Sequence, residues 1–254
     1  MNKVLNLSVI IITKNEEKDI RACLESVKDL SNDIVIVDSG STDKTLDICR
    51  SYTQKIFHNE FKGYSQQKQA ALEHAERAWV LNIDADERVS DALKDEIRAL
   101  LGNNSYSQNG FLIPFRNYFL GGRLRFGSVR SEKHIRLFKR DQAQYGLDNV
   151  HEGIVVKPPV SELKNPIDHY SYQTIEEYLK KCNWYTSLSA EEKYAQGIRF
   201  RFYHHLRLPY EFFVRYFLKL GFLDGKRGLL FAFLSAYYVW MKYVKILDVE
   251  QKKE

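Results

Sequence analysis

Short runs of apolar, largely β-branched residues alternate with stretches of helical periodicity through the first part of the chain, and this alternation limits the possible folds more than any other feature. The runs at residues 7–13 and 34–37 are apolar at nearly every position, which is typical of parallel strands covered on both faces. Shorter strands are predicted at residues 55–57 and 78–83, and helices at residues 16–27, 64–77, 90–101 and from residue 42. This order predicts an α/β fold with a mostly parallel, doubly wound, twisted sheet and flanking helices.

The pattern changes after Gly102. Short, partly antiparallel strands are predicted at residues 111–115, 123–126, 135–138 and 153–156. Helical spacing dominates from Thr174 onward, where Thr174 and Glu177 form the spacing of a capping box. We therefore predict two regions, an α/β domain over residues 1–170 and a helical region over residues 171–254.

Polar residues follow three of the predicted parallel strands, at residues 13–16, 38–43 and 84–87. In open α/β sheets, ligands bind in the crevice at the carboxyl ends of the strands, where such loops meet. Capping of the following helix by Asp or Ser explains any one of these loops equally well. It explains all three at one edge of the sheet less well, so this edge is the predicted site.

Asp84-Ala85-Asp86 is the most specific element of that edge because an apolar strand delivers both carboxylates directly to it. Carboxylate oxygens are hard ligands suited to Mg²⁺ or Mn²⁺, and either cation can in turn bind a diphosphate. The chain contains neither a Walker-type phosphate loop nor a Gly-x-Gly-x-x-Gly motif. A phosphate group at this edge would therefore be held by a metal and by side chains.

Three motifs in order resemble the opening motifs of family 2 glycosyltransferases: SVIIITKNE at residues 8–16, IVDSGSTD at 36–43 and LNIDADE at 81–87. The resemblance implies the glycosyltransferase A-type nucleotide-diphospho-sugar fold and an inverting reaction. KGYSQQK at residues 62–68 and NVHE at 149–152 are similar, more narrowly, to bacterial lipopolysaccharide core β-glucosyltransferases. This narrower similarity implies a UDP-sugar donor, glucose as the sugar, and a lipopolysaccharide inner-core or other surface-glycan acceptor. Sequence patterns alone do not distinguish one hexose donor from another.

The resemblance also implies roles for individual residues of the nucleotide pocket. Thr13, Asn15 and Glu16 would line the pocket, and Asp38 would pair with the uracil ring. Residues 1–170 would then be the nucleotide-sugar-binding catalytic domain, and residues 171–254 an acceptor-binding or membrane-association region.

For the donor's diphosphate, the resemblance implies that Asp84 lies near the ribose and the metal and that Asp86 is the direct metal ligand. The metal would stabilise the charge that builds up on the departing UDP. Lys68 could contact the donor, although an ordinary solvated lysine explains it equally well. Arg136 could bind an anion of the donor or acceptor, with an exposed salt bridge on a strand as the alternative.

An inverting transfer needs a base that takes the proton from the acceptor hydroxyl. Residues 148–152 are the best candidate stretch because this group must act from outside the nucleotide half. Glu152 is the first choice and Asp148 the second. His151 could complete the metal shell or bind phosphate, although an isolated histidine is more often structural.

The positive charge of the chain is concentrated near one end. The net charge is +5, of which residues 193–227 carry +6, from eight basic and two acidic residues, leaving −1 for the remainder. Aromatic residues alternate with these cations, so the segment is predicted either to pack against the catalytic domain or to lie on anionic lipid. The second possibility predicts a cytoplasmic enzyme that is peripheral on the inner face of the cytoplasmic membrane.

Two further observations bear on location. The apolar run at residues 228–241 is shorter than the roughly 20 residues that span a bilayer, so no transmembrane helix is predicted. The three cysteines are odd in number and widely spaced, which fits a reducing compartment rather than a disulfide framework.

Two other functions are compatible with parts of the sequence. A nucleic-acid-binding module would use the basic and aromatic segment, but it leaves the acidic Asp84-Ala85-Asp86 loop unexplained. A nucleotidyltransferase would use the metal site, but it normally has a glycine-rich basic loop after its first strand, which residues 13–17 lack. We therefore expect a glycosyltransferase that binds no nucleic acid.

Overall fold

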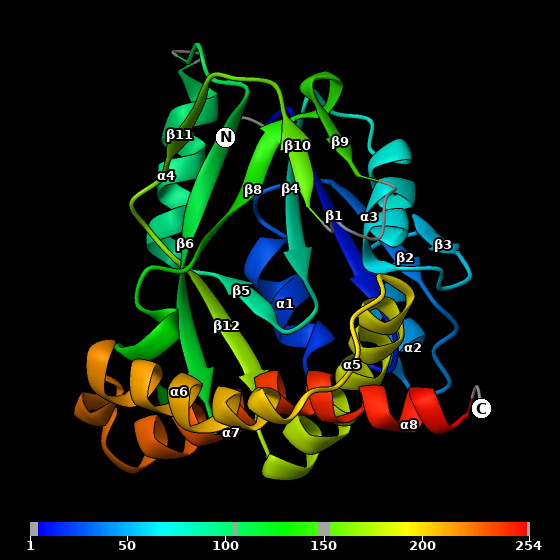
Figure 1. The fold of residues 1–254 in the computed structure, drawn as a ribbon. Coiled ribbons are helices and arrows are strands. Elements are labelled where there is room, and N and C mark those ends of the chain that lie inside the picture. Colours follow the sequence, from blue (N-terminus) through cyan, green and yellow to red (C-terminus); the bar gives the residue numbers. More distant parts are fainter. Residues whose placement is uncertain (1–4, 104–105, 147–152, 253–254) are drawn as a thin grey trace. The chain divides into compact units, whose positions relative to one another are not determined.

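The structure of the chain, a computed structural model, describes residues 5–103, 106–146 and 153–252 (Figure 1). The chain divides into two compact units by its contacts. Unit 1 comprises Met1–Phe115 and Lys133–His169, and unit 2 comprises Arg116–Glu132 and Tyr170–Glu254. The predicted division had a single boundary at residue 170, whereas the contacts also place residues 116–132 with the C-terminal helices.

Unit 1 contains the parallel strands that the sequence predicts, in the spatial order β3-β2-β1-β4. These strands are β1 (Leu7–Thr13), β2 (Asp33–Asp38), β3 (Ile56–His58) and β4 (Trp79–Asp84). The helices of this part are α1 (Ile20–Val27), α2 (Thr45–Arg50), α3 (Tyr64–Glu73) and α4 (Asp91–Gly102). The mostly parallel sheet with flanking helices is therefore confirmed.

Antiparallel pairing extends the sheet beyond β4. Strand β8 (Lys133–Lys139) runs antiparallel to β4, and β6 (Gly110–Phe119), β12 (Ile167–Tyr172) and β5 (Glu87–Val89) follow in that order. Short strand β11 (Val160–Glu162) pairs with β6, and β9 (Ala143–Tyr145) with β10 (Ile154–Val156) in a separate hairpin. Several of these strands are only three residues long, too short for a recognisable alternating pattern.

Both faces of the parallel strands are covered, which explains why their sequences are apolar at almost every position. On one face, Ile11 lies in a buried cluster with Leu24 of α1 and Leu93 of α4. On the other face, Ile10 lies in a second buried cluster with Leu72 of α3.

Side chains cap the starts of two helices. Ser90 accepts a hydrogen bond from the Leu93 N–H and caps α4, and Thr174 and Glu177 form the predicted capping box of α5. The helix predicted from residue 42 begins three residues later, at Thr45, where the Asp43 carboxylate accepts the Thr45 N–H at 3.0 Å.

Unit 2 is built around α5 (Ile175–Ala195), α6 (Arg207–Phe213), α7 (Gly225–Val244) and α8 (Ile246–Gln251), with the short strand β7 (Gly122–Arg123). A π-helical segment, Val214–Leu218, continues α6. The strand predicted at residues 123–126 is wrong beyond Arg123. The buried residues at the centre of the unit are Phe119, Leu124, Tyr178, Cys182 and Leu234.

The sequence predicts no transmembrane helix because the apolar run at residues 228–241 is too short. The structure differs in the length of the helix, which extends beyond this run on both sides. The run belongs to a helical stretch of 31 residues, Gly221–Gln251, because helical structure continues through charged residues on both sides of it. By length and composition alone this stretch could span a bilayer, a criterion that core helices of soluble proteins also meet.

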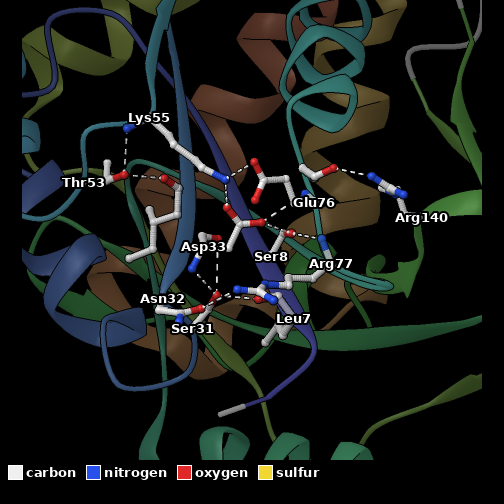
Figure 2. A network of polar contacts seen from close by, with 12 residues as sticks. Leu7, Ser8, Ser31, Asn32, Asp33, Thr53, Lys55, Glu76, Arg77 and Arg140 are labelled. Atoms are coloured by element: carbon white, nitrogen blue, oxygen red, sulfur yellow. Dashed lines mark hydrogen bonds and ion pairs between the residues drawn. The ribbon is translucent and has the colours of Figure 1, made fainter.

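A polar network joins the beginnings of β1 and β2 to the segment before β4 (Figure 2). The buried Asp33 carboxylate accepts hydrogen bonds from the Ser8 hydroxyl, from the Lys55 ammonium at 2.6 Å and from the Glu76 N–H at 3.1 Å. Burial raises the pKa of Asp33, but these three donors lower it by more, so the pKa lies below its usual value.

Replacing Asp33 by Asn should lower the free energy of unfolding by about 2–3 kcal/mol at pH 7, because the amide cannot replace a buried carboxylate that accepts three hydrogen bonds, one of them from the partly exposed Lys55 ammonium. A depressed pKa in the folded state stabilises the protein above the unfolded-state pKa of about 3.9, and that stabilisation is lost as the pH falls. Urea unfolding at pH 7 and at pH 3 should therefore show the difference between the two proteins shrinking at pH 3.

Asp47→Asn is the matched control, because Asp47 pairs with Arg50 on the surface of α2. An exposed pair of this kind contributes about 0.5 kcal/mol or less. If Asp33→Asn costs no more than this control at pH 7, the network does not hold the strand beginnings together.

Candidate active site

The register of the parallel strands brings the three predicted loops to one edge of unit 1. Thr13 at the end of β1 pairs with Asp38 at the end of β2, and Ile12 pairs with Asp84 at the end of β4. The Ser39 N–H donates to the Thr13 carbonyl at 3.0 Å, which joins the first two loops at their base.

The first two loops interlock through their polar side chains. Asn15 has a left-handed backbone with φ 56°, and its side-chain carbonyl accepts the Thr42 N–H at 2.8 Å. Its own N–H donates to the Ser41 hydroxyl at 2.9 Å, and the Glu16 N–H donates to the Thr45 hydroxyl at 2.8 Å. The loop after β1 is therefore fixed by the loop after β2, which gives the edge a defined shape.

Asp38 orders the second of these loops. Its buried carboxylate accepts the N–H groups of Gly40 at 2.8 Å and Ser41 at 2.9 Å, and also the Ser41 hydroxyl. Gly40 has φ 87°, a conformation that favours glycine in this tight turn. The neighbouring Thr13 hydroxyl is buried and has no hydrogen-bond partner among the described residues.

Asp84 lies between two cations. Its Oδ1 is 2.7 Å from the Lys68 ammonium at the start of α3, and its Oδ2 is 2.7 Å from the Arg136 guanidinium on β8. The Lys68 contact is an ion pair without hydrogen-bond geometry, so Oδ1 has no hydrogen-bond donor in the described residues. Burial raises the pKa of Asp84, but the positive charges of Arg136 and Lys68 lower it by more, so the pKa lies well below its usual range.

Arg136 also binds Glu87, a partner that the sequence did not reveal. Both side chains are buried, and Glu87 additionally accepts the Asp84 N–H at 3.0 Å. The guanidinium lies 5.3 Å from the centre of the Phe115 ring. Burial raises the pKa of Glu87, Arg136 lowers it and Asp84 raises it, with a net increase. Arg136 is therefore a buried bridge between two carboxylates, and its interpretation as an exposed salt bridge is wrong.

Asp86 projects from the turn between β4 and β5. Its Oδ2 lies 3.6 Å from Nε2 of His169. The β5–β12 register places His169 opposite Glu87. The His169 and Phe115 rings are nearly perpendicular, and their centres lie 5.7 Å apart. No sequence pattern pointed to His169, because its position depends on the pairing of two short strands far apart in the chain.

The carboxylates suit a cation that is shared with a ligand rather than enclosed by protein. Within the described part of the chain, no group of three or more His, Cys, Asp or Glu side chains forms a metal cage. Mg²⁺ is commonly held by one or two carboxylates together with substrate phosphates. Asp84 and Asp86 match that donor set, and Asp84 Oδ1 lies buried without a hydrogen-bond donor in the described structure.

The predicted base candidates Glu152 and Asp148, and the predicted ligand His151, lie outside the described residues. The hairpin that flanks them is described. The Gly146 N–H donates to the Gly153 carbonyl at 3.2 Å, and the Tyr145 N–H donates to the Gln69 side chain of α3 at 3.1 Å. The hairpin is thereby attached to the same helix that carries Lys68.

Comparison with known proteins gives one consistent family. Residues 8–157 match the sequence model of Glycosyl transferase family 2. The lipopolysaccharide core biosynthesis glycosyltransferase LpsC of Rhizobium meliloti is 33% identical over 254 residues, covering 94% of this chain and 93% of LpsC. An uncharacterized glycosyltransferase of Rickettsia typhi is 30% identical over 262 residues, covering 97% of this chain and 88% of the relative.

Among solved structures, residues 1–349 of S. aureus TarS in complex with UDP-GlcNAc align with a TM-score of 0.49 and 19% identity, covering 94% of this chain and 82% of that one. A glucosyl-3-phosphoglycerate synthase from Mycobacterium tuberculosis in complex with Mn²⁺ and UDP-glucose aligns with a TM-score of 0.35 and 20% identity, covering 46% of this chain and 45% of that one.

Replacing Arg136 by Gln should lower the free energy of unfolding by about 3–5 kcal/mol, because the buried Glu87 loses the charge that compensates it and Asp84 keeps only Lys68. Adding Glu87→Gln in the Arg136→Gln background should recover part of this loss, because one uncompensated buried carboxylate is removed. Urea unfolding of the single and double variants measures both effects.

Lys133→Gln on the same strand is the control, because Lys133 forms an exposed pair with Glu162 and should cost about 0.5 kcal/mol or less. The claim that Arg136 bridges the two carboxylates would be contradicted if Arg136→Gln and Lys133→Gln lowered the free energy of unfolding equally. It would also be contradicted if the effects of Arg136→Gln and Glu87→Gln were strictly additive in the double variant.

Proposed function

This chain belongs to glycosyltransferase family 2, and we propose that it moves a sugar, with inversion, from a UDP-sugar to a lipopolysaccharide inner-core or other surface-glycan acceptor. Its mostly parallel sheet with flanking helices is the glycosyltransferase A-type fold. The observation that carries the proposal is the Asp84-Ala85-Asp86 turn, which ends β4 at the same edge as the loops after β1 and β2.

Similarity to LpsC over nearly the full length of both chains supports a role in lipopolysaccharide core biosynthesis. Glucose is proposed as the sugar because the motifs at residues 62–68 and 149–152 resemble those of β-glucosyltransferases. The three cysteines are free and buried, in agreement with a location in the reducing cytoplasm.

We assign the nucleotide to the interlocked loops after β1 and β2. Thr13, Asn15 and Glu16 form one wall, where the buried Thr13 hydroxyl still has hydrogen-bonding capacity. Asp38 lies beside the proposed uracil position. The Asp38 carboxylate already accepts three hydrogen bonds from its own loop. We therefore propose that Asp38 mainly positions the loop backbone that contacts the uracil ring.

The donor's diphosphate is assigned to the neighbourhood of Asp84, Asp86 and Lys68. A divalent cation, Mg²⁺ or Mn²⁺, held by Asp86 and Asp84 would stabilise the charge on the departing UDP. Lys68 is partly exposed, and its ammonium group contacts the Asp84 carboxylate. The same ammonium group can therefore also bind a donor phosphate. Arg136 is buried and fixes the direction of the Asp84 carboxylate; it is a positioning residue.

The acceptor hydroxyl attacks the anomeric carbon from the face opposite UDP, and its proton passes to a carboxylate. We propose Glu152 for this role, with Asp148 as the second candidate and His151 as an additional metal or phosphate ligand.

Asp86→Asn should reduce UDP release from a UDP-sugar and acceptor at least about a hundredfold in the presence of Mn²⁺, because it removes the proposed metal ligand. Asp91→Asn, at an exposed position on α4, should leave the rate unchanged. The measurement is coupled detection of free UDP, with pyrophosphate measured in parallel from UTP. Pyrophosphate release without UDP release would instead indicate nucleotidyl transfer.

Glu152→Gln should reduce transfer about 10²–10⁴-fold while UDP-sugar binding is retained, because the amide cannot take the acceptor proton. Single-turnover transfer and donor titration by calorimetry separate the two effects. Near-normal transfer by Glu152→Gln together with loss in Asp148→Asn would assign the base to Asp148 instead.

A further inference from the structure

The two units carry charges of opposite sign. Unit 2 contains 18 Lys and Arg against 10 Asp and Glu, a net of +8, whereas unit 1 contains 20 against 23, a net of −3. The positive charge of the protein therefore belongs to unit 2, which the proposed donor site does not use.

The apolar stripe of α6 and its π-helical continuation faces outward. Leu206, Tyr210, Phe213 and Phe217 recur at the spacing of one helix face and are between 48% and 65% exposed. The inward side carries an ion pair between Glu211 and Arg215 at 3.1 Å, and Arg215 also donates to Ser128. This arrangement is the reverse of a helix that packs its apolar face on a core.

Helix α7 packs against α6 (Figure 1). Its inward side carries the small residues Gly228, Ala232 and Ala236, all buried. A Cβ at Gly228 would collide with the Gly221 carbonyl, so only glycine permits this close approach. Of the large residues of α7, Leu234 is buried, whereas Leu229 and Phe233 are exposed.

Cations surround these aromatic residues, and the acids of the same region point inward. The exposed cations are Arg199, Arg201, Arg207, Lys219, Lys226 and Arg227. The two acids between residues 199 and 233 are Glu211, paired with Arg215, and Asp224, which accepts the N–H groups of Arg125 and Phe126. The outer surface therefore presents aromatic side chains and positive charge together.

We propose that this surface, the exposed side chains of residues 199–233, docks in the plane of a membrane that contains anionic lipid. Exposed Tyr and Phe side chains enter the boundary between headgroups and acyl chains, and Arg and Lys meet the lipid phosphates. The proposal rests on the proposed function in one respect: a lipid-linked acceptor places the reaction at a membrane.

Contacts within unit 2 favour docking in the plane over spanning by α7. The Tyr178 hydroxyl of α5 donates to the Leu234 carbonyl at 2.8 Å, and Leu234 belongs to the buried centre of the unit. Lys245 donates to the Asn183 side chain at 2.7 Å and to Ser187 at 2.8 Å. A spanning α7 would have to give up these contacts with α5.

Vesicle flotation of the full chain tests the proposal without donor or acceptor, so its failure is distinguishable from failure of the transferase assignment. Wild type should float with vesicles of phosphatidylglycerol and phosphatidylcholine and be released by high salt. Lys219→Glu/Lys226→Glu and, separately, Phe213→Ser/Phe217→Ser should each weaken binding more than about tenfold. Far-UV circular dichroism checks that each variant is folded.

Matched controls use exposed residues outside the segment 199–233. Lys157→Glu/Lys164→Glu in unit 1 and Leu179→Ser/Leu188→Ser on α5 should bind like wild type. Equal binding to purely neutral vesicles, equal losses in the controls, or resistance to salt would overturn the proposal. A dimer in solution that the Phe213→Ser/Phe217→Ser variant dissociates, without vesicle binding by wild type, would assign the surface to a second copy of the chain.

Discussion

The buried Arg136 guanidinium determines the geometry of the candidate site because it binds two carboxylates that lie three positions apart in the chain. Asp84 ends the last parallel strand, and Glu87 begins the strand that turns back from it. Without the cation, the buried Glu87 carboxylate would be uncompensated beside the partly exposed Asp84 carboxylate at the sheet edge. The antiparallel strand β8 is therefore part of the site: it supplies the charge that allows an acidic turn to exist there.

The sequence predicted the part of this arrangement that depends on local patterns. Continuous apolar runs identified β1, β2 and β4, and the acids at their ends identified the edge of the sheet. The roles of Glu87 and His169 were not predictable in this way, because they arise from pairing between strands β4, β5, β8 and β12. The alternation of aromatic residues with cations likewise identified the segment that contains α6, but it does not tell whether the aromatic side chains point to a core or to the outside.

The division of charge between the units follows from their different tasks in the proposed reaction. Unit 1 concentrates carboxylates at one sheet edge, where a cation and a diphosphate can compensate them. Unit 2 concentrates cations around exposed aromatic side chains, where anionic lipid can compensate them. In α6 the ion pair between Glu211 and Arg215 lies on the inward side, and the aromatic residues Phe213 and Phe217 are exposed, as is Phe233 of α7.

The central claim, that the edge of unit 1 binds a UDP-sugar through a divalent cation, is tested most directly by calorimetry on the wild-type chain. UDP-glucose, UDP-galactose and UDP-N-acetylglucosamine are titrated separately with Mn²⁺ and with a chelator. We predict saturable binding of at least one UDP-sugar that weakens more than about tenfold when the cation is removed. Absence of binding by all three donors in the presence of Mn²⁺ would contradict the account.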